Sequence, residues 1–585
     1  MHRRKESDCP ECREIERLAH SMNRRTALKG AAATAAGAAL AGRLASTGAQ
    51  GTPSSGEQVD PTQDQPQQTF PLTEEKKTLH VMVRSNPGVE DFASNEFTQW
   101  FEERTNIHVE WEVLPLDTDG TANTALNLRL ASGDYAEVLL DFNPSPSVLQ
   151  LYGSQGVFLP LNDLIESQGV YSKKVFSDYP AALKASTASD GNVYALPQIN
   201  DCFHCSMASK LWINQQWTEN LGLDLPVTTD DYLATLTAFK NDDPNGNGKA
   251  DEIPLTGSSQ LWNGWMEQYF VNAFTFHPGN RLRLTVVDGK VTPAYTQDGW
   301  KEAIRYLASL TAAGVLDPEI FTRDRDQARA LGDGNGGPDM VVGSIAAGWW
   351  GEFTTYASGE GGPWQQYTAL SPLEGPEGVR YAAYDPYQAV SIGELIITDK
   401  CEDPELAYKW ADALYEIEAT TRNVHGVKDR DWAWAEIGET GINGQQAIWR
   451  NITNVSDLPT QNIHWSQTGP TYRSSDYRLS QFIAEEDRPT DVEVILYNLT
   501  KENYEPFKQP DEMALPPLYF VDEAAQFIAE LAPTIQSAVD ETFALGVTGQ
   551  IDIDDAWDGY IASLNDMGLD QFVAYHQEAY DGANQ

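Results

Sequence analysis

The chain after residue 77 opens with alternating strand and helix patterns. Residues 79–83 form a short apolar run that is typical of a buried strand. Phe97, Trp100 and Phe101 then share one face of a predicted helix. Residues 107–113 carry Ile, Val, Trp and Val at every second position, which predicts a strand with one buried face.

The same alternation continues along the chain. A helix is predicted through Leu126 and Leu130, and Gly133 ends it, because glycine readily adopts the left-handed conformation that follows a helix. Residues 138–140, Val-Leu-Leu, predict the next buried strand. A β-α-β-α-β order of this kind predicts an α/β layer on a mostly parallel sheet.

A further helix is predicted near the C-terminus. Ile535, Val539 and Phe543 lie four residues apart and therefore line one helix face. Pro533 is expected in the first turn of that helix, where its missing N–H does no harm.

Residues 241–255, NDDPNGNGKADEIPL, predict a calcium loop. Oxygen donors fall close together along it, and Gly246 and Gly248 allow the tight left-handed turns that wrap a backbone around an ion. The loop is not an EF-hand, because Pro254 stands where that motif needs its bidentate Glu, and Glu252 takes the bidentate role instead. The alternative is an Asn-Gly surface turn without metal. The predicted ligands are Asp243, Asn245, Asn247, the Lys249 carbonyl, Asp251 and Glu252.

The same loop carries a family resemblance. Together with GVFLPLNDLIE, DGNVYALPQIN, KLWINQQW and the C-terminal WDGYIASLNDMGLDQFVAYHQEAYD, it resembles the extracellular solute-binding proteins of ABC importers. The similarity is to the large branch that includes alginate-binding and other oligosaccharide-binding proteins. It implies a two-lobed, periplasmic-binding-protein-like (Venus flytrap) α/β fold that closes on a ligand, with a structural calcium ion, ABC permease subunits as partners and a monomeric state.

The resemblance also implies where the chain crosses between lobes. Residues 195–201 are expected to leave the first lobe, 343–350 to return to it and 390–392 to leave it again. The resulting division has an export signal at 1–49, a disordered linker at 50–76, lobe 1 at 77–198 and 350–392, and lobe 2 at 199–349 and 393–585.

Charge narrows the function. The 585 residues include 86 acidic and 40 basic side chains, which gives a net charge of −46. Because binding to nucleic acid needs a basic surface, this charge excludes a general nucleic-acid-binding protein. Repulsion among so many carboxylates is relieved by salt, so a halophilic source is inferred, the alternative being an ordinary acidic secreted protein.

The N-terminus predicts export. Residues 23–29, NRRTALK, resemble a twin-arginine motif, and a weakly apolar run follows to Leu44. Met22 is an alternative start. No cysteine follows the apolar run, so the usual lipoprotein anchor is missing and the mode of cell attachment stays open. The protein is expected to be exported by the twin-arginine route and to be extracellular or periplasmic, associated with the cell surface.

Three cysteines follow the signal, Cys202, Cys205 and Cys401. Cys202 and Cys205 are either a disulfide or a plain buried pair. Asn451, Asn454 and Asn498 each begin a glycosylation sequon, but a pattern of three residues often arises by chance.

The sixteen tryptophans are candidates for binding a sugar. A flat aromatic ring stacks on the apolar face of a sugar, whereas amides, acids and Arg bond its hydroxyls. For each tryptophan, ordinary core packing is the alternative. Arg84 and Asn200 are assigned to the cleft by analogy with the family. The candidate ligand-binding residues are Arg84, Asn200, Trp262, Trp349, Trp350, Trp432, Trp434 and Trp465.

Enzyme signatures do not fit. The GDGNGG at 332–337 follows an Arg/Ala-rich helical pattern instead of a strand, so it is not a dinucleotide site, and GxSxG and HExxH do not occur. The sequence therefore predicts a non-enzymatic receptor for an oligosaccharide. A peptide or other non-sugar receptor on the same fold and, less favoured, a secreted polysaccharide-degrading enzyme remain as alternatives.

Overall fold

The computed structural model describes residues 58–583 except 117–121, 338, 356–361, 454, 456–457, 459 and 521. The predicted export signal and Met22 lie outside these residues. The described part contains a six-stranded sheet and a three-stranded sheet, each with its own hydrophobic cluster. We call the elements around the six-stranded sheet the first lobe and those around the three-stranded sheet the second lobe.

The first lobe is built on six strands in the order β13-β4-β10-β3-β1-β2. β1 pairs in parallel with β2 and β3, whereas β10 is antiparallel to both β3 and β4. The strands are β1 (Lys77–Arg84), β2 (Ile107–Leu114), β3 (Val138–Leu140), β4 (Leu196–Asn200), β10 (Val390–Ile397) and β13 (Tyr472–Arg473).

Both faces of this sheet are buried, as parallel sheets require. Val81 and Val83 of β1 point into one cluster and Met82 points into the other. The helices of this lobe are α2 (Glu96–Thr105), α3 (Asn123–Ser132), α4 (Pro146–Ser154), α5 (Asn162–Gln168), α6 (Tyr171–Asp178), α7 (Pro180–Ser186), α13 (Pro404–Ala413), α14 (Ile417–His425) and α15 (Ser475–Leu479). The predictions for the first two helices and for the C-cap at Gly133, whose φ is 73°, are confirmed.

The second lobe has the sheet order β8-β5-β9 and two separate two-stranded pairs accompany the main sheets. Its strands are β5 (Lys210–Asn214), β8 (Ser344–Ala347) and β9 (Tyr367–Leu370), with the pair β6 (Leu284–Val287)–β7 (Lys290–Pro293). The pair β11 (Trp432–Trp434)–β12 (Trp449–Asn451) belongs to the first lobe, because its tryptophans pack with residues of α14 and α15. Its helices are α8 (Gln215–Leu221), α9 (Thr229–Asn241), α10 (Glu267–Phe270), α11 (Asp298–Ala312), α12 (Arg325–Gly332), α16 (Val492–Asn503), α17 (Asp522–Val547), α18 (Ile553–Met567) and α19 (Leu569–Ala583).

Short 3₁₀ turns complete the secondary structure, at Pro61–Asp64, Val271–Ala273, Ala294–Thr296, Pro318–Phe321, Trp350–Glu352, Pro363–Gln366, Glu505–Phe507 and Asp511–Met513. None of the described helices is both long and apolar enough to cross a membrane.

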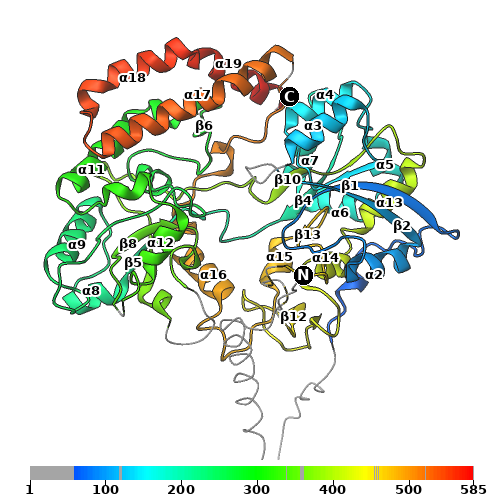
Figure 1. Ribbon diagram of the computed structural model, residues 1–585, viewed down its shortest axis with the longest axis horizontal. Coiled ribbons are helices and arrows are strands. Elements are labelled where there is room, and N and C mark those ends of the chain that lie inside the picture. Colours follow the sequence, from blue (N-terminus) through cyan, green and yellow to red (C-terminus); the bar gives the residue numbers. More distant parts are fainter. Residues whose placement is uncertain are drawn as a thin grey trace, which may run out of the picture. The chain divides into compact units, whose positions relative to one another are not determined.

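The C-terminal helices α17, α18 and α19 pack together, and α17 and α18 pack against α11 (Figure 1). Ile535, Val539 and Phe543 are buried as predicted. Pro533, however, lies inside α17 instead of in its first turn, so that prediction is wrong. The helix begins earlier because Ile528 and Leu531, which precede the proline, also pack against the second-lobe cluster.

The segments divide between the lobes differently from the expectation. β8 pairs with β5, and Trp350 and Trp364 lie in the second-lobe cluster, so residues 343–355 and 362–370 belong to the second lobe and do not return to the first. The chain re-enters the first lobe at β10, whose apolar residues pair with β3, and it stays there through α13 and α14. The second lobe resumes at α16, where Leu496 joins its cluster.

The described part of the expected linker is ordered against the first lobe. Val59 N donates to Ala435 O at 2.8 Å, and Leu72 N donates to Thr105 O at 3.1 Å. The Arg104 guanidinium lies 4.2 Å above the Phe70 ring. The prediction of a disordered linker is therefore wrong for residues 58–76. The polar composition suggested disorder, but a few apolar residues suffice to hold this segment against the first lobe.

Candidate functional site

The first lobe contributes a charged cluster at one edge of its sheet. Arg84 ends β1 and Asp141 follows β3, and the carboxyl ends of parallel strands meet at the same edge. The Arg84 Nη2 lies 2.9 Å from Asp141 Oδ2, and its Nε lies 3.3 Å from the same oxygen. The Arg84 side chain is 29% exposed and that of Asp141 is 7% exposed. Arg84 is thus partly open to solvent, as a ligand-binding residue must be.

A second carboxyl group lies behind this ion pair. Glu394 of β10 is buried, and its backbone carbonyl accepts a hydrogen bond from Asp141 N at 2.7 Å. Burial, together with the nearby Asp141 carboxylate, raises the pKa of Glu394 well above its usual range. Burial also raises the pKa of Asp141, although Arg84 opposes that shift. The arrangement favours a protonated Glu394 beside an Arg84–Asp141 ion pair.

Asn200, the last residue of β4, takes part in a polar network instead of standing free. Its Oδ1 accepts a hydrogen bond from Arg478 Nη1 at 2.7 Å. Arg478 Nη2 lies 3.4 Å from Glu493 Oε1, and Glu493 Oε2 lies 3.4 Å from His204 Nε2. Arg478 belongs to α15 of the first lobe and Glu493 to α16 of the second. This network therefore ties the two lobes together where β4 ends.

Residues 201–209, which we call the hinge segment, connect β4 of the first lobe to β5 of the second. Cys202 and Cys205 form a disulfide within it. The buried Lys210 Nζ donates to the carbonyls of His204 at 3.1 Å and Met207 at 2.6 Å. The hinge segment is therefore a constrained turn.

The hinge segment also forms one wall of a small cavity of about 80 Å³, which we call the hinge cavity. Trp262 is half-exposed, at 39%, and is the most open tryptophan among the described large apolar side chains. The cavity is lined by Cys205, Ser206, Ala208, Ser209, Trp262, Asn263, Pro278, Gly279, Ala383, Tyr384, Asp385 and Gln388. An aromatic ring with hydroxyl, amide and carboxyl groups around it is the combination that a sugar requires.

Glu352 holds the two neighbouring tryptophans. Its Oε2 accepts from Trp262 N at 3.1 Å and its Oε1 accepts from the Trp349 indole N–H at 3.3 Å. Gly348 donates its N–H to Trp262 O at 2.7 Å. A Cβ on Gly348 would lie 2.0 Å from the Trp262 ring, so only glycine fits beneath this ring. Trp349 is half-buried beside it.

Four of the tryptophans predicted as ligand contacts are core residues in this structure. Trp350 is 1% exposed, with its ring 5.0 Å from that of Trp364. Trp432 and Trp434 pack on each other in a satellite cluster, and Trp465 is fully buried and donates to Thr98 Oγ1 at 2.7 Å. Their position between glycine and polar residues in the sequence was misleading, because those neighbours are themselves in tight turns.

Several residues of the hinge cavity carry no recognisable signal in the sequence. Asp385 accepts a hydrogen bond from Tyr387 N at 2.9 Å, and its own N–H donates to Ser206 O at 3.0 Å. Burial raises the pKa of the Asp385 carboxyl. It lies in the connection between β9 and β10, where no periodic pattern distinguishes a cavity residue from an ordinary turn.

The predicted calcium loop follows α9 and adopts the expected turns. Gly246 and Gly248 have φ values of 70° and 75°. Asp243 accepts hydrogen bonds from Asn247 N at 3.1 Å and from Gly248 N at 3.0 Å. Glu252 Oε1 is buried without a hydrogen-bond partner among the described residues, and burial raises the pKa of this carboxyl, with Asp251 and Asp243 adding to the shift. A buried carboxylate oxygen without a donor fits a cation ligand.

Within the described part of the chain, one group of three His, Cys or acidic side chains brings its ligand atoms within 4.8 Å of one another, namely Cys202, His204 and Cys205. Both sulfurs are in the disulfide, so this group does not form a metal site.

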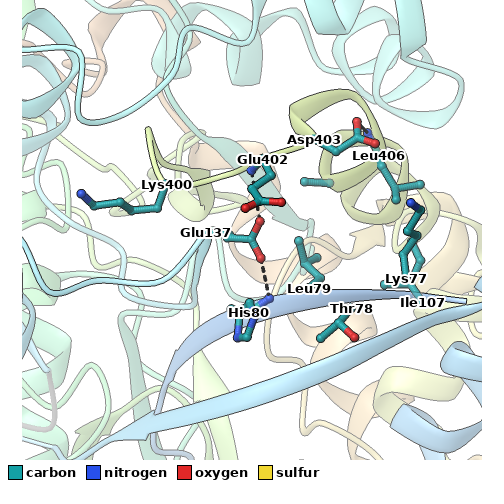
Figure 2. Close-up of a pocket in the computed structure, with 11 residues that line it drawn as sticks. Lys77, Thr78, Leu79, His80, Ile107, Glu137, Lys400, Glu402, Asp403 and Leu406 are labelled. Atoms are coloured by element: carbon teal, nitrogen blue, oxygen red, sulfur yellow. Dashed lines mark hydrogen bonds between the residues drawn. The ribbon is translucent and has the colours of Figure 1, made fainter.

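Among the described residues, larger cavities lie elsewhere, two of them of more than 400 Å³. One, of about 420 Å³, opens at the start of β1, at the opposite edge of the first sheet from Arg84, and Figure 2 shows Glu137 in it between His80 and Glu402. Glu137 accepts there from the backbone N–H groups of His80 and Glu402. The other, of about 760 Å³, is lined by residues of α19, Tyr519 and the segment after α7. Ligands of open α/β sheets bind at the carboxyl ends of the strands, so the Arg84 edge and the hinge cavity are the better candidate.

Comparison with known proteins decides the family. Residues 86–421 match the family model described as bacterial extracellular solute-binding protein. The chain belongs to this family. This solute-binding protein is 28% identical over 522 residues to the fructooligosaccharide ABC transporter substrate-binding protein FusA of Streptococcus pneumoniae, a match that covers 88% of this chain and 91% of FusA.

Solved structures agree with the sequence match. The structure of FusA in complex with kestose is 26% identical, with a TM-score of 0.69, and the match covers 87% of this chain and 100% of that one. An EF-hand mutant of FusA in complex with fructo-nystose gives 26% identity and a TM-score of 0.68 with the same coverage. The two-lobed α/β fold of extracellular solute-binding proteins, predicted from the sequence, is thereby confirmed.

Proposed function

We propose that this solute-binding protein is the receptor of an ABC importer and that it binds an oligosaccharide between the Arg84 edge of the first lobe and the hinge cavity of the second. The observation that carries the proposal is the half-exposed Trp262 ring at the hinge, surrounded by hydroxyl, amide and carboxyl groups. The similarity to FusA over 88% of the chain supports a sugar as the ligand.

In this proposal the ligand acts by closing the lobes and no bond is broken. Contacts with both lobes make the closed state ligand-dependent, because a ligand shifts a conformational equilibrium only through its different affinity for the two states. The closed form is then the one that the permease recognises.

Titration calorimetry with kestose, maltotriose, cellotriose and a tripeptide, followed by chromatography of the sugars, tests this function. We expect saturable binding of a trisaccharide that is recovered intact, and at least tenfold weaker binding by the Trp262→Ala variant. Hydrolysed sugar would indicate an enzyme, and binding of the peptide alone would indicate a non-sugar receptor.

The loop at 243–252 is proposed as a structural calcium site. Its donor set consists of oxygen atoms, which Ca²⁺ prefers, and the orphaned Glu252 Oε1 supports a cation there. An ion at this place would stabilise the second lobe at a distance from the ligand. The residues that would hold it are Asp243, Asn245, Asn247, the Lys249 carbonyl, Asp251 and Glu252.

Export by the twin-arginine route and life in a saline habitat are part of the same proposal. The NRRTALK motif supports the first, and the net charge of −46 supports the second. Cleavage near Gln50, detected by N-terminal sequencing of the exported protein, would test the export route.

A further inference from the structure

The charges around the proposed site are already balanced by one another. On the first lobe, Arg84 lies 2.9 Å from Asp141, and the second carboxyl group, Glu394, lies behind that pair. The ion pair leaves no net positive charge at this edge. A ligand that brought an additional negative charge would therefore have to compete with Asp141 for Arg84.

The hinge cavity is similarly without a cation of its own. The described residues that line it include Asp385 but neither Lys nor Arg. Lys508, which does not line the cavity, is held by Tyr384 and Asp511: its Nζ lies 3.3 Å from the Tyr384 hydroxyl and 3.4 Å from Asp511 Oδ1.

Three further cations, which adjoin residues of the cavity in the chain or through Glu352, are also paired. Arg325 lies 3.2 Å from Glu352, the residue that holds Trp262, and Arg281 lies 3.1 Å from Asp540. Lys210, behind the hinge segment, donates to two backbone carbonyls. Each of these cations is committed to a partner within the protein.

From this charge pattern we infer that the site selects uncharged oligosaccharides and rejects acidic ones such as uronates. The inference rests on the proposed function and specifies its ligand class. Transfer of a sugar carboxylate from water into a site without a free cation carries a desolvation penalty that no counter-charge offsets. Asp385 adds like-charge repulsion, which is a recognised means of excluding a wrong partner.

The local origin of this selectivity distinguishes it from the effect of the −46 net charge. Repulsion by the whole surface is screened by salt, because the Debye length falls to about 3 Å at 1 M. The desolvation penalty within the cavity is not screened. The preference for uncharged sugars should therefore persist at high salt.

The test compares neutral trisaccharides (kestose, maltotriose, cellotriose) with trigalacturonate and trimannuronate by titration calorimetry, at 0.15 M and 2 M NaCl. We expect the best neutral sugar to bind at least about 100-fold more tightly than either uronate at both salt concentrations. Asp385→Asn should reduce this affinity ratio about tenfold. Glu110→Gln, at an exposed position of strand β2, should leave the ratio unchanged.

Gln388→Lys gives an independent check that does not remove a buried group, because Gln388 is exposed at the cavity. The added cation should raise the affinity for the uronates at least tenfold. Uronate binding as tight as that of the neutral sugars, or a ratio that disappears at 2 M NaCl, would overturn the inference and leave the receptor function standing. Failure of every sugar to bind would overturn the proposed function itself.

Discussion

Two tryptophans of this protein should respond in opposite ways to truncation. Trp262 is 39% exposed at the hinge cavity, whereas Trp350 is 1% exposed in the second-lobe core. Trp350 also packs edge-on against Trp212 at 5.1 Å, in addition to its stacking on Trp364. Trp350→Ala would therefore leave a cavity in the core and should lower the free energy of unfolding by about 3–5 kcal/mol.

For Trp262 the magnitude follows from the ring area that is still open. A tryptophan side chain presents up to about 250 Å². At 39% exposure, about 100 Å² remain for a sugar to cover. At about 25 cal/mol per Å² this area contributes about 2.5 kcal/mol to binding, or about a 60-fold change in Kd. Trp262→Ala should lower the free energy of unfolding by only about 1 kcal/mol.

Urea denaturation and titration calorimetry on both variants measure the two quantities separately. The expected result is weaker sugar binding with nearly normal stability for Trp262→Ala. At temperatures where Trp350→Ala remains folded, it should show lower stability and bind the sugar within about threefold of the wild type. If Trp350→Ala abolished binding without destabilising the protein, while Trp262→Ala bound normally, the assignment of the two rings would be refuted.

Three further predictions concern stability. With calcium at 100 times its Kd, the proposed loop site should add about 2.7 kcal/mol to the free energy of unfolding; EDTA should remove this increment, and Glu252→Gln should not respond to calcium. Burial raises the pKa of Glu416 from its ordinary 4.5 to about 7, although the nearby Arg104 opposes this shift. Between pH 4.5 and 7 the native state therefore holds a proton at Glu416 that the unfolded state has lost. The free energy of unfolding should fall by about 3 kcal/mol as the pH rises through this range. Urea titrations at several pH values should show that Glu416→Gln lacks this pH dependence. If the free energy of unfolding of Glu416→Gln varied with pH as steeply as that of the wild type, the assignment to Glu416 would be refuted. The Cys202→Ala/Cys205→Ala double variant should lose about 2 kcal/mol of free energy of unfolding, as expected for the short loop that this disulfide closes. It should also bind the sugar more weakly, because Cys205 lines the hinge cavity. Sugar binding equal to that of the wild type would contradict a role of the disulfide in shaping the cavity.

The elements predicted best from the sequence are those in which apolar residues repeat at regular intervals along the chain. Val81 and Val83 alternate with Met82 between the two faces of the first sheet, and the strand and its neighbours were predicted from such runs. Gly246 and Gly248 adopt the left-handed turns because their position in the loop demands them. These features depend on residues close together in the chain.

Features that depend on distant partners could not be predicted in the same way. Trp262 and Trp350 look alike in sequence, and only the packing of Trp350 between Trp212 and Trp364 separates a core residue from a surface one. The order of the lobe crossings follows from the pairing of β10 with β3, residues more than 200 positions apart. Asp385 becomes a cavity residue only because its backbone meets Ser206 of the hinge segment.

A crystal structure of the protein with the tightest-binding neutral trisaccharide would show directly where the sugar binds. The proposed function predicts a sugar ring stacked on Trp262, hydroxyl groups bonded to Asp385 or Gln388, and a contact from Arg84 on the opposite lobe. A sugar bound instead in the cavity beside α19 and Tyr519, with Trp262 still open to solvent, would contradict it.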